Sequence, residues 1–288
     1  MGGSRYALSE RKISRWTKEA RGLGRGASYR PWLTMHDVPS HGLSVRVLGV
    51  TTGRIHQLLS GVERAVFLEC DWSHAVTDIR EQFPLPRDVT RRIAQEMGVV
   101  HPADGRVDVV MTTDLLLDVN GVDQDLSFEL PPGTGRRRLA ISIKSREEQL
   151  TLRERDKLEI ERRYWRGLGI TWLLLFLDDI PEDQWRKLMW LHEWFTLDFM
   201  GEDAARLFRA KCDRVLVHLA CAQDQRAGGF MERVDADEQW TPGTTLAAIR
   251  HLAANGRVTT STDRLYDAWG PLGQFTVAAQ HGALARSA

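Results

Sequence analysis

The stretch RLAISIKSREE (residues 138–148) decides the fold, because it alternates like a β-strand that is buried on one face. Leu139, Ile141 and Ile143 would point to one side of this strand, and Ser142 and Lys144 to the other. A lysine is costly to bury without a partner. The pattern therefore predicts that Lys144 faces a polar or charged group near the end of the strand.

The segments on both sides of this strand alternate between extended and helical patterns. The order helix, strand, strand, helix, strand predicts an α/β core. Expected strands and hairpins are LSVRVLGVTTGRIHQLL (43–59), which turns near Thr52-Gly53, VTDIREQFPL (76–85), MTTDLLLDVNG (111–121) and the buried ITWLLLFLDD (170–179). Expected helices are SGVERAVFLECDW (60–72), with Ser60 as N-cap, RDVTRRIAQEMG (87–98), which Gly98 stops, and REEQLTLRERDKLEIERRYWRGLG (146–169).

The hydrophobic pattern of the sequence changes after Asp179, where helical patterns dominate. The last of these patterns ends in an Asn-Gly pair that predicts a hairpin, which suits a small helical or winged-helix domain. We therefore expect a basic N-terminal arm with few strong hydrophobics (1–35), a core domain (36–178) and a C-terminal helical domain (179–288). The expected C-terminal helices are residues 181–195, 202–220 and 245–254.

The composition is that of a soluble globular protein, with 42% hydrophobic and 27% charged residues among 288. No apolar run approaches the roughly 20 residues that span a bilayer, and no secretory leader is evident. The three cysteines are scattered and fit neither a disulfide framework nor a zinc cluster. We therefore expect a cytoplasmic protein without a membrane partner, associated with the nucleoid when it is on DNA.

The formal net charge is zero, but the charge is unevenly distributed. Residues 1–35 carry a net charge of +6 and residues 131–170 a net charge of +5, whereas residues 178–288 carry −4. Two basic blocks favour a polyanion partner for the first 170 residues. Solvated faces remain the alternative for either block alone.

Asp114 and Lys144 lie on two strands that would pair as a hairpin. Metal-dependent phosphodiesterases use this arrangement, because the carboxylate holds a hard divalent cation and the lysine offsets charge in the transition state. Glu63, on a preceding helix, can supply a second oxygen ligand, and the carbonyl of Ile143 a third. The spacing alone leaves alternatives open, since Asp114 could cap a turn and Lys144 could extend along the strand end to reach water.

Several long motifs, in order along the chain, resemble the TnsA endonuclease subunit of heteromeric cut-and-paste transposases. They are EARGLGRGASYRPWLTMHDVPSHG (19–42), TGRIHQLLSGVERAVFLECDW (52–72), VTDIREQFPL, MTTDLLLD (111–118), AISIK (140–144), KLEIERRYW (157–165) and GTTLAAIRHLAANGRV (243–258). The resemblance implies a restriction-endonuclease-like mixed sheet flanked by helices, followed by a mainly helical domain of winged-helix type. It also implies Mg²⁺-dependent cleavage of the 5′-end strands at transposon borders, with Mn²⁺ tolerated.

The resemblance assigns roles to individual residues. It implies that Glu63, Asp114, Lys144 and Glu161 are catalytic. Glu63, Asp114 and the Ile143 carbonyl would hold the metal. Ser142 stands where the family usually has Gln or Glu, so direct ligation there would depend on its hydroxyl or a bridging water.

The implied partners are duplex DNA, a DDE-type transposase subunit and an AAA+ ATPase regulator. Five arginines in the basic blocks are candidates for phosphate contacts: Arg25, Arg30, Arg136, Arg137 and Arg138. Two other functions remain open at this point. One is a non-catalytic subunit that bridges transposase, regulator and DNA, and the other is a stand-alone restriction or repair nuclease.

Overall fold

The computed structural model describes residues 7–38, 44–121, 126–128, 136–146, 150–222, 225–260 and 267–278. The chain divides into two compact units, residues 1–181 and residues 182–288. No helix in these described ranges is long and apolar enough to cross a bilayer.

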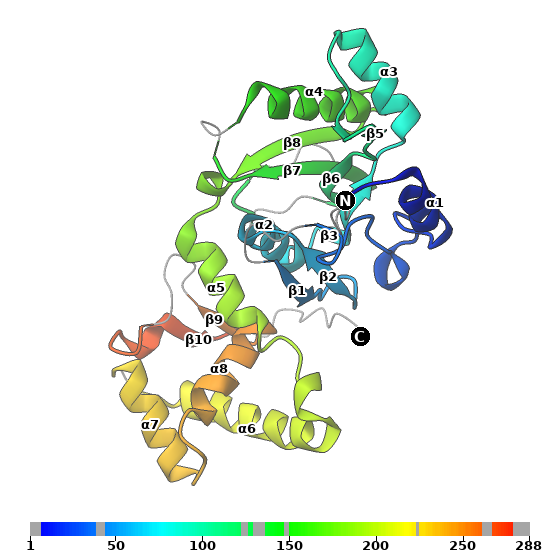
Figure 1. Cartoon of the computed structure of the whole chain (residues 1–288). Coiled ribbons are helices and arrows are strands. Elements are labelled where there is room, and N and C mark those ends of the chain that lie inside the picture. Colours follow the sequence, from blue (N-terminus) through cyan, green and yellow to red (C-terminus); the bar gives the residue numbers. More distant parts are fainter. Residues whose placement is uncertain are drawn as a thin grey trace. The chain divides into compact units, whose positions relative to one another are not determined.

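A four-stranded mixed sheet is the centre of the first unit (Figure 1). Its first three strands pair antiparallel, and the last pair is parallel, with a helix as the crossover connection. The mixed α/β core that the sequence predicted is confirmed. In spatial order the strands are β3 (Val76–Pro84), β6 (Thr112–Asn120), β7 (Arg136–Lys144) and β8 (Thr171–Phe176).

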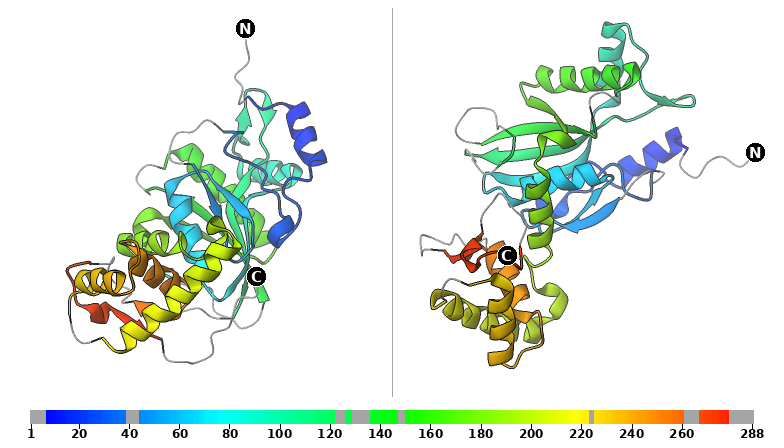
Figure 2. Two further views of the ribbon diagram at one scale, coloured as in Figure 1. Left: turned by 90° about the horizontal axis from the view of Figure 1, so that it is seen from below. Right: turned by 90° about the vertical axis from the view of Figure 1, so that its left-hand side faces the viewer.

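Helices cover both faces of this sheet. Helices α3 (Arg87–Met97) and α4 (Leu152–Gly167) lie on one face, and α2 (Gly61–Trp72) lies on the other (Figures 1 and 2). Ser60 caps α2, a capping box at Thr151 starts α4, and Gly98 ends α3 in the left-handed conformation. These helix positions agree with the sequence prediction.

Strand β7 is buried on both faces, so the prediction of a single buried face was wrong. Ala140 and Ser142 are as inaccessible as Leu139 and Ile141. The reason is that α3 and α4 form a second core with this face of the sheet. That core contains Leu85, Ala94, Met111, Leu116, Ala140, Ile160 and Trp165. Conversely, β8 was predicted to be buried but is mostly half-exposed, because it lies at the edge of the sheet.

The segment predicted to be a basic arm is folded. Helix α1 (Glu10–Lys18) buries Ile13 and Trp16 against Trp32, and the two indole rings meet edge to face with centroids 5.4 Å apart. The prediction of few strong hydrophobics missed these aromatic anchors. The other small elements of this unit are the hairpin β1 (Val45–Leu48) and β2 (Ile55–Leu58), the pair β4 (Ala103–Asp104) and β5 (Val107–Asp108), and the 3₁₀ turns at Gly26–Ser28 and Leu177–Asp179.

The second unit is mainly helical, as predicted. Asn255 ends the last helix, and the strand that follows pairs with residues 275–277, so the expected hairpin at the Asn-Gly pair was wrong. The sequence prediction also missed one helix, α7. The elements are α5 (Glu182–His192), α6 (Glu202–Ala220), α7 (Ala227–Asp237), α8 (Thr244–Ala254), β9 (Val258–Thr260), β10 (Phe275–Val277) and 3₁₀ turns at Asp198–Met200 and Leu272–Gln274.

Candidate active site

Glu63 is held at the start of α2 by its own cap. Its main-chain N–H donates to the Ser60 hydroxyl (3.1 Å), which donates in turn to Glu63 Oε1 (3.0 Å). The N–H of Leu59 donates to Oε2 (3.0 Å). Two hydrogen bonds to the carboxylate and one from the main chain therefore fix Glu63, which is only 8% exposed. The local sequence alone produces this rigidity, because a serine cap and an acid three residues later form a helix start.

Asp114 is anchored across the sheet. Its Oδ2 accepts a hydrogen bond from the main-chain N–H of Ile143 (2.7 Å), the residue that precedes Lys144. Lys144 in turn donates from Nζ to the carbonyl of Ile143 (3.1 Å). The pairing of β6 with β7 therefore joins the carboxylate, the carbonyl and the ammonium group at one end of the two strands.

One glutamine side chain lies between the two carboxylates. Nε2 of Gln82, on β3, donates to Glu63 Oε2 and to Asp114 Oδ1, each at 3.4 Å. The structure thus brings Glu63 and Asp114 within hydrogen-bonding distance of a single amide group, although 51 positions separate them in the sequence. Sequence analysis did not single out Gln82. The available signal was its place in the extended segment VTDIREQFPL, which forms the strand beside Asp114.

Glu161 lies deeper in the protein, behind this group. Its Oε1 accepts hydrogen bonds from the hydroxyls of Thr113 (2.6 Å) and Ser142 (2.7 Å). The Ser142 oxygen also accepts from the indole N–H of Trp172 (2.9 Å). Ser142 is 1% exposed, and its hydroxyl is directed at Glu161. The serine therefore connects the buried glutamate of α4 to the strand that carries Lys144.

The electrostatics of the site reflect an excess of negative charge. Burial, and then repulsion from Asp114, raise the pKa of Glu63 to about 7. The same two causes raise the pKa of Glu161 to about 7. The positive charge of Lys144 lowers both values but does not compensate fully. Glu63 and Glu161, which both lie near Asp114, are therefore both stabilised by the positive charge of the same lysine, Lys144.

The carboxylate oxygens of the site suit a hard divalent cation, because such ions prefer oxygen ligands and these oxygens carry unbalanced negative charge. Within the described parts of the chain, no group of three or more His, Cys, Asp or Glu side chains could hold a metal ion by itself. A metal site here would therefore combine the carboxylates of Glu63 and Asp114 with neutral oxygens. The Ile143 carbonyl is one such oxygen.

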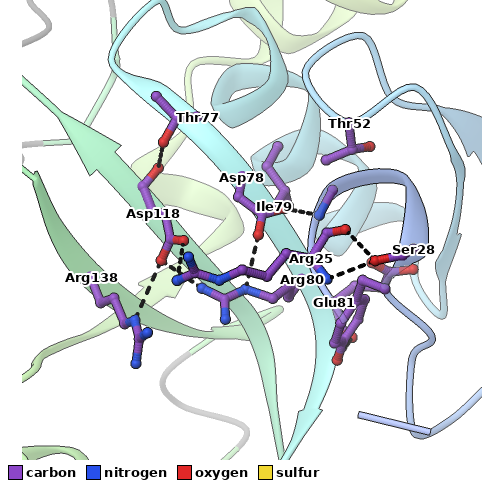
Figure 3. A network of polar contacts seen from close by, with 12 residues as sticks. Arg25, Ser28, Thr52, Thr77, Asp78, Ile79, Arg80, Glu81, Asp118 and Arg138 are labelled. Carbon is purple, nitrogen blue, oxygen red and sulfur yellow. Dashed lines mark hydrogen bonds and ion pairs between the residues drawn. The ribbon is translucent and has the colours of Figure 1, made fainter. Parts of the chain in front are cut away.

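Two of the arginines expected to contact DNA meet at Asp118, four residues beyond Asp114 on β6. Arg25 lies 2.9 Å from one carboxylate oxygen, and Arg80 and Arg138 lie 2.6 and 3.5 Å from the other (Figure 3). Arg25 and Arg138 are 61% and 49% exposed in their side chains. At about 3.3 Å per strand residue, Asp118 is about 13 Å from Asp114 along the strand.

Of the remaining arginine candidates, Arg136 and Arg137 directly precede Arg138 on β7, and Arg30 lies elsewhere. Arg136 and Arg137 start β7, so about 26 Å of strand separates Arg136 from Lys144. Arg30 is exposed and donates to the carbonyl of Glu19 (3.1 Å). Arg25 and Arg138 therefore share Asp118 as a partner, whereas Arg30 contacts a different residue, Glu19.

Two family models and one relative match the chain. The TnsA-like endonuclease N-terminal model matches residues 73–176, and the TnsA endonuclease C-terminal model matches residues 179–261. The transposon Tn7 transposition protein TnsA of Escherichia coli is 38% identical over 257 residues, which are 89% of the chain and 88% of the relative. The chain belongs to the TnsA endonuclease family. The TnsA match includes the strands that carry Asp114 and Lys144 and the helix that carries Glu161.

Proposed function

We propose that the chain is a metal-dependent DNA endonuclease that cuts the 5′-end strands at transposon borders within a cut-and-paste transposition complex. The observation that carries this proposal is the meeting of Glu63 and Asp114 at one amide, with Lys144 beside them on the next strand. Membership of the TnsA family supports it, because the matching relative is a transposition protein of Tn7.

Glu63, Asp114 and the carbonyl of Ile143 would hold Mg²⁺, and Mn²⁺ would be tolerated because it accepts the same oxygen ligands. When bound, the ion supplies a Lewis acid for a phosphoryl oxygen and lowers the pKa of water. Ser142 is better suited to orienting Glu161 than to direct ligation, because its hydroxyl already donates to that glutamate and accepts from Trp172.

Lys144 would assist hydrolysis through its charge. Its ammonium group contacts the carbonyl of Ile143, next to the N–H that holds Asp114. A positive charge at this place offsets negative charge that develops on the scissile phosphate. The rigid caps of Glu63 and the cross-strand bond of Asp114 keep their carboxylates in place before substrate arrives, so little reorganisation is needed.

Duplex DNA would lie along β6 and β7, from the end that carries Asp114 and Lys144 towards Asp118 and Arg138. The distance of about 13 Å from Asp114 to Asp118 is well below one turn of B-DNA, about 34 Å, so one duplex could contact Arg25 and Arg138 as well as the active site. Arginine contacts to phosphate position DNA and carry no sequence information directly. A DDE-type transposase subunit would supply the cuts at the 3′-ends, and an AAA+ ATPase regulator would complete the complex.

A nicking assay on transposon-end DNA with reconstituted partner subunits tests this function. Wild type should cut the 5′-end strand only when a divalent ion is present. Asp114→Ala and Lys144→Ala should lose cleavage by at least about a hundredfold, the loss typical of removing one electrostatic catalytic group. Gel-shift measurements should show that both variants still assemble on DNA.

Each outcome of this assay separates the alternatives. Assembly without cleavage by the wild type would support a non-catalytic bridging subunit. Cleavage by the chain alone, without partner subunits, would support a stand-alone nuclease. Full cleavage by Asp114→Ala would refute the assigned site.

A further inference from the structure

Gln82 is a buried polar residue directed into the active site. It is only 3% exposed, and its three side-chain hydrogen bonds within the described residues are to the site or next to it. The amide nitrogen donates to Glu63 and Asp114, and the amide oxygen accepts from the hydroxyl of Thr112 (3.1 Å). None of these three bonds is part of the backbone hydrogen bonding of a helix or sheet.

The backbone of Gln82 is strained. Its φ angle is +49°, in the left-handed region that residues with a side chain rarely adopt. Such a conformation costs about 1–3 kcal/mol and persists only where its surroundings enforce it. Here the carbonyl of Gln82 accepts a hydrogen bond from the N–H of Trp32 (3.2 Å). Arg54 and His56 hydrogen-bond to the side chain of the preceding residue, Glu81, and so hold the strand on that side.

The amide nitrogen occupies a place that favours a full positive charge. Both of its hydrogen bonds are long, at 3.4 Å, and an amide N–H carries only a partial charge. Glu63 and Asp114 are two carboxylates that share this one amide group, and two like charges so close together repel each other. A divalent cation between the same two carboxylates would offset this repulsion far better than an amide does.

A cation in this place needs additional oxygen ligands. The two carboxylates already accept hydrogen bonds from Leu59, Ser60 and Ile143, and Ser142 is directed at Glu161. The side chain of Gln82 offers a further oxygen. This oxygen lies on the same amide group as the nitrogen that now bridges the carboxylates.

We infer that Gln82 is a metal-binding residue of this site, which turns its amide when the ion enters; this inference rests on the proposed metal-dependent function. In the metal-free chain the nitrogen faces the carboxylates. With the ion bound, the oxygen faces the metal and the nitrogen faces Thr112. The Thr112 hydroxyl can donate or accept, so its hydrogen bond to Gln82 persists in both states. The turn therefore replaces two long bonds without leaving a buried amide unpaired.

Binding of Mn²⁺ to the full chain without DNA tests this role, because the signal of free Mn²⁺ in electron paramagnetic resonance reports affinity rather than cleavage. Gln82→Met removes the oxygen at similar volume and should weaken binding by about tenfold or more. Gln82→Glu adds a third carboxylate and should bind Mn²⁺ more tightly, while lowering the melting temperature of the metal-free chain. Gln95→Met, an exposed change on α3, is the matched control and should leave affinity unchanged.

Thr112→Val is a second, milder variant that keeps the inference testable should Gln82→Met fail to fold. It removes the hydroxyl that holds the amide in either orientation and should weaken Mn²⁺ binding by a smaller factor than Gln82→Met. Asp114→Ala should abolish binding. Unchanged affinity in Gln82→Met or, if that variant is unfolded, in Thr112→Val, together with loss in Asp114→Ala, would overturn the role of Gln82 and leave the proposed function intact. Absence of Mn²⁺ binding by the wild type would overturn both.

Discussion

Two buried glutamates in the first unit, Glu63 and Glu81, have opposite electrostatic environments. Glu81 is completely buried, and its carboxylate accepts hydrogen bonds from Arg54 (2.8 Å) and His56 (2.8 Å). Burial alone would raise its pKa, but the bonds from Arg54 and His56 outweigh burial and hold the pKa at about 2. Glu63 faces Asp114 instead, and burial, followed by repulsion from Asp114, raises its pKa to about 7.

The two residues show two environments for a buried negative charge, one balanced by neighbouring side chains and one not. The charge of Glu81 is balanced by the chain itself, so this glutamate joins β2 to β3 as part of the scaffold. The charge of Glu63 is left without a balancing cation at hydrogen-bonding distance in the described chain, so it is available to a cation from outside. The same residue type therefore has a structural role at Glu81 and the proposed metal-binding role at Glu63.

Removing the two glutamates should affect folding very differently. Glu81→Ala leaves Arg54 buried without its partner and should lower the free energy of unfolding by about 3–5 kcal/mol. Glu63→Gln keeps an oxygen to accept from Leu59 and removes the repulsion with Asp114, so the metal-free variant should be at least as stable as wild type. Urea unfolding followed by tryptophan fluorescence measures both, with the partly exposed Glu159→Gln as control. Equal losses in Glu81→Ala and Glu63→Gln would contradict the contrast.

The pH dependence of stability should have opposite signs for the two residues. The pKa of Glu81 is lowered from 4.5 to about 2, so its contribution is present above pH 4.5 and is lost as the pH falls towards 2. That loss amounts to about 3 kcal/mol, and Glu81→Gln should remove it. The pKa of Glu63 is raised from 4.5 to about 7, so the metal-free chain should lose stability as the pH rises across this interval.

Calorimetric melting from pH 2 to 8 without divalent ions measures these slopes. Glu63→Gln should reduce the loss of stability between pH 4.5 and 7. It should leave unchanged the loss of stability between pH 4.5 and 2, which comes from Glu81. Glu161, whose pKa is also raised to about 7, should contribute to the same decrease, so part of it should persist in Glu63→Gln. A metal-free chain whose stability rises steadily from pH 4.5 to 7 would contradict the assignment.

A divalent ion should sharpen the contrast further. Mg²⁺ or Mn²⁺ at a hundred times its dissociation constant should stabilise the wild type by about 2.7 kcal/mol, because only the folded chain offers the site. Glu63→Gln should lose most of this gain, whereas Glu81→Gln should melt earlier but keep the full increment. Thermal melting with and without the ion provides the measurement. An equal loss of the increment in both variants would indicate that Glu81 also belongs to the metal site.

The smallest expected effects concern the hydroxyls beside each glutamate. Ser60→Ala removes the cap of α2 and should cost about 1 kcal/mol. It also removes the hydrogen bond that holds Glu63 Oε1 in place, so it should weaken metal binding. Thr52→Val removes the partner of His56 Nε2 and should cost a similar amount without changing metal affinity. Urea unfolding and Mn²⁺ titration of both variants separate the two roles.

The sequence predicted most of the core elements because their signals are local. Ser60 followed by Glu63, the left-handed Gly98 and the alternation of β6 and β7 each act within a few residues. The same reasoning missed α1 and the second buried face of β7. In both cases burial depends on partners far along the chain, namely Trp32 for α1 and the helices α3 and α4 for β7.

The sequence by itself determined the type of chemistry, through carboxylates and a lysine on an α/β core and through the TnsA resemblance. Only the tertiary structure decided which polar residues share the site. Gln82 enters it through a strained backbone, whereas Glu81, the adjacent residue, is held by Arg54 and His56. The physical reason is that the energy of a buried polar group depends on its neighbours in space, and strand pairing and helix packing place those neighbours.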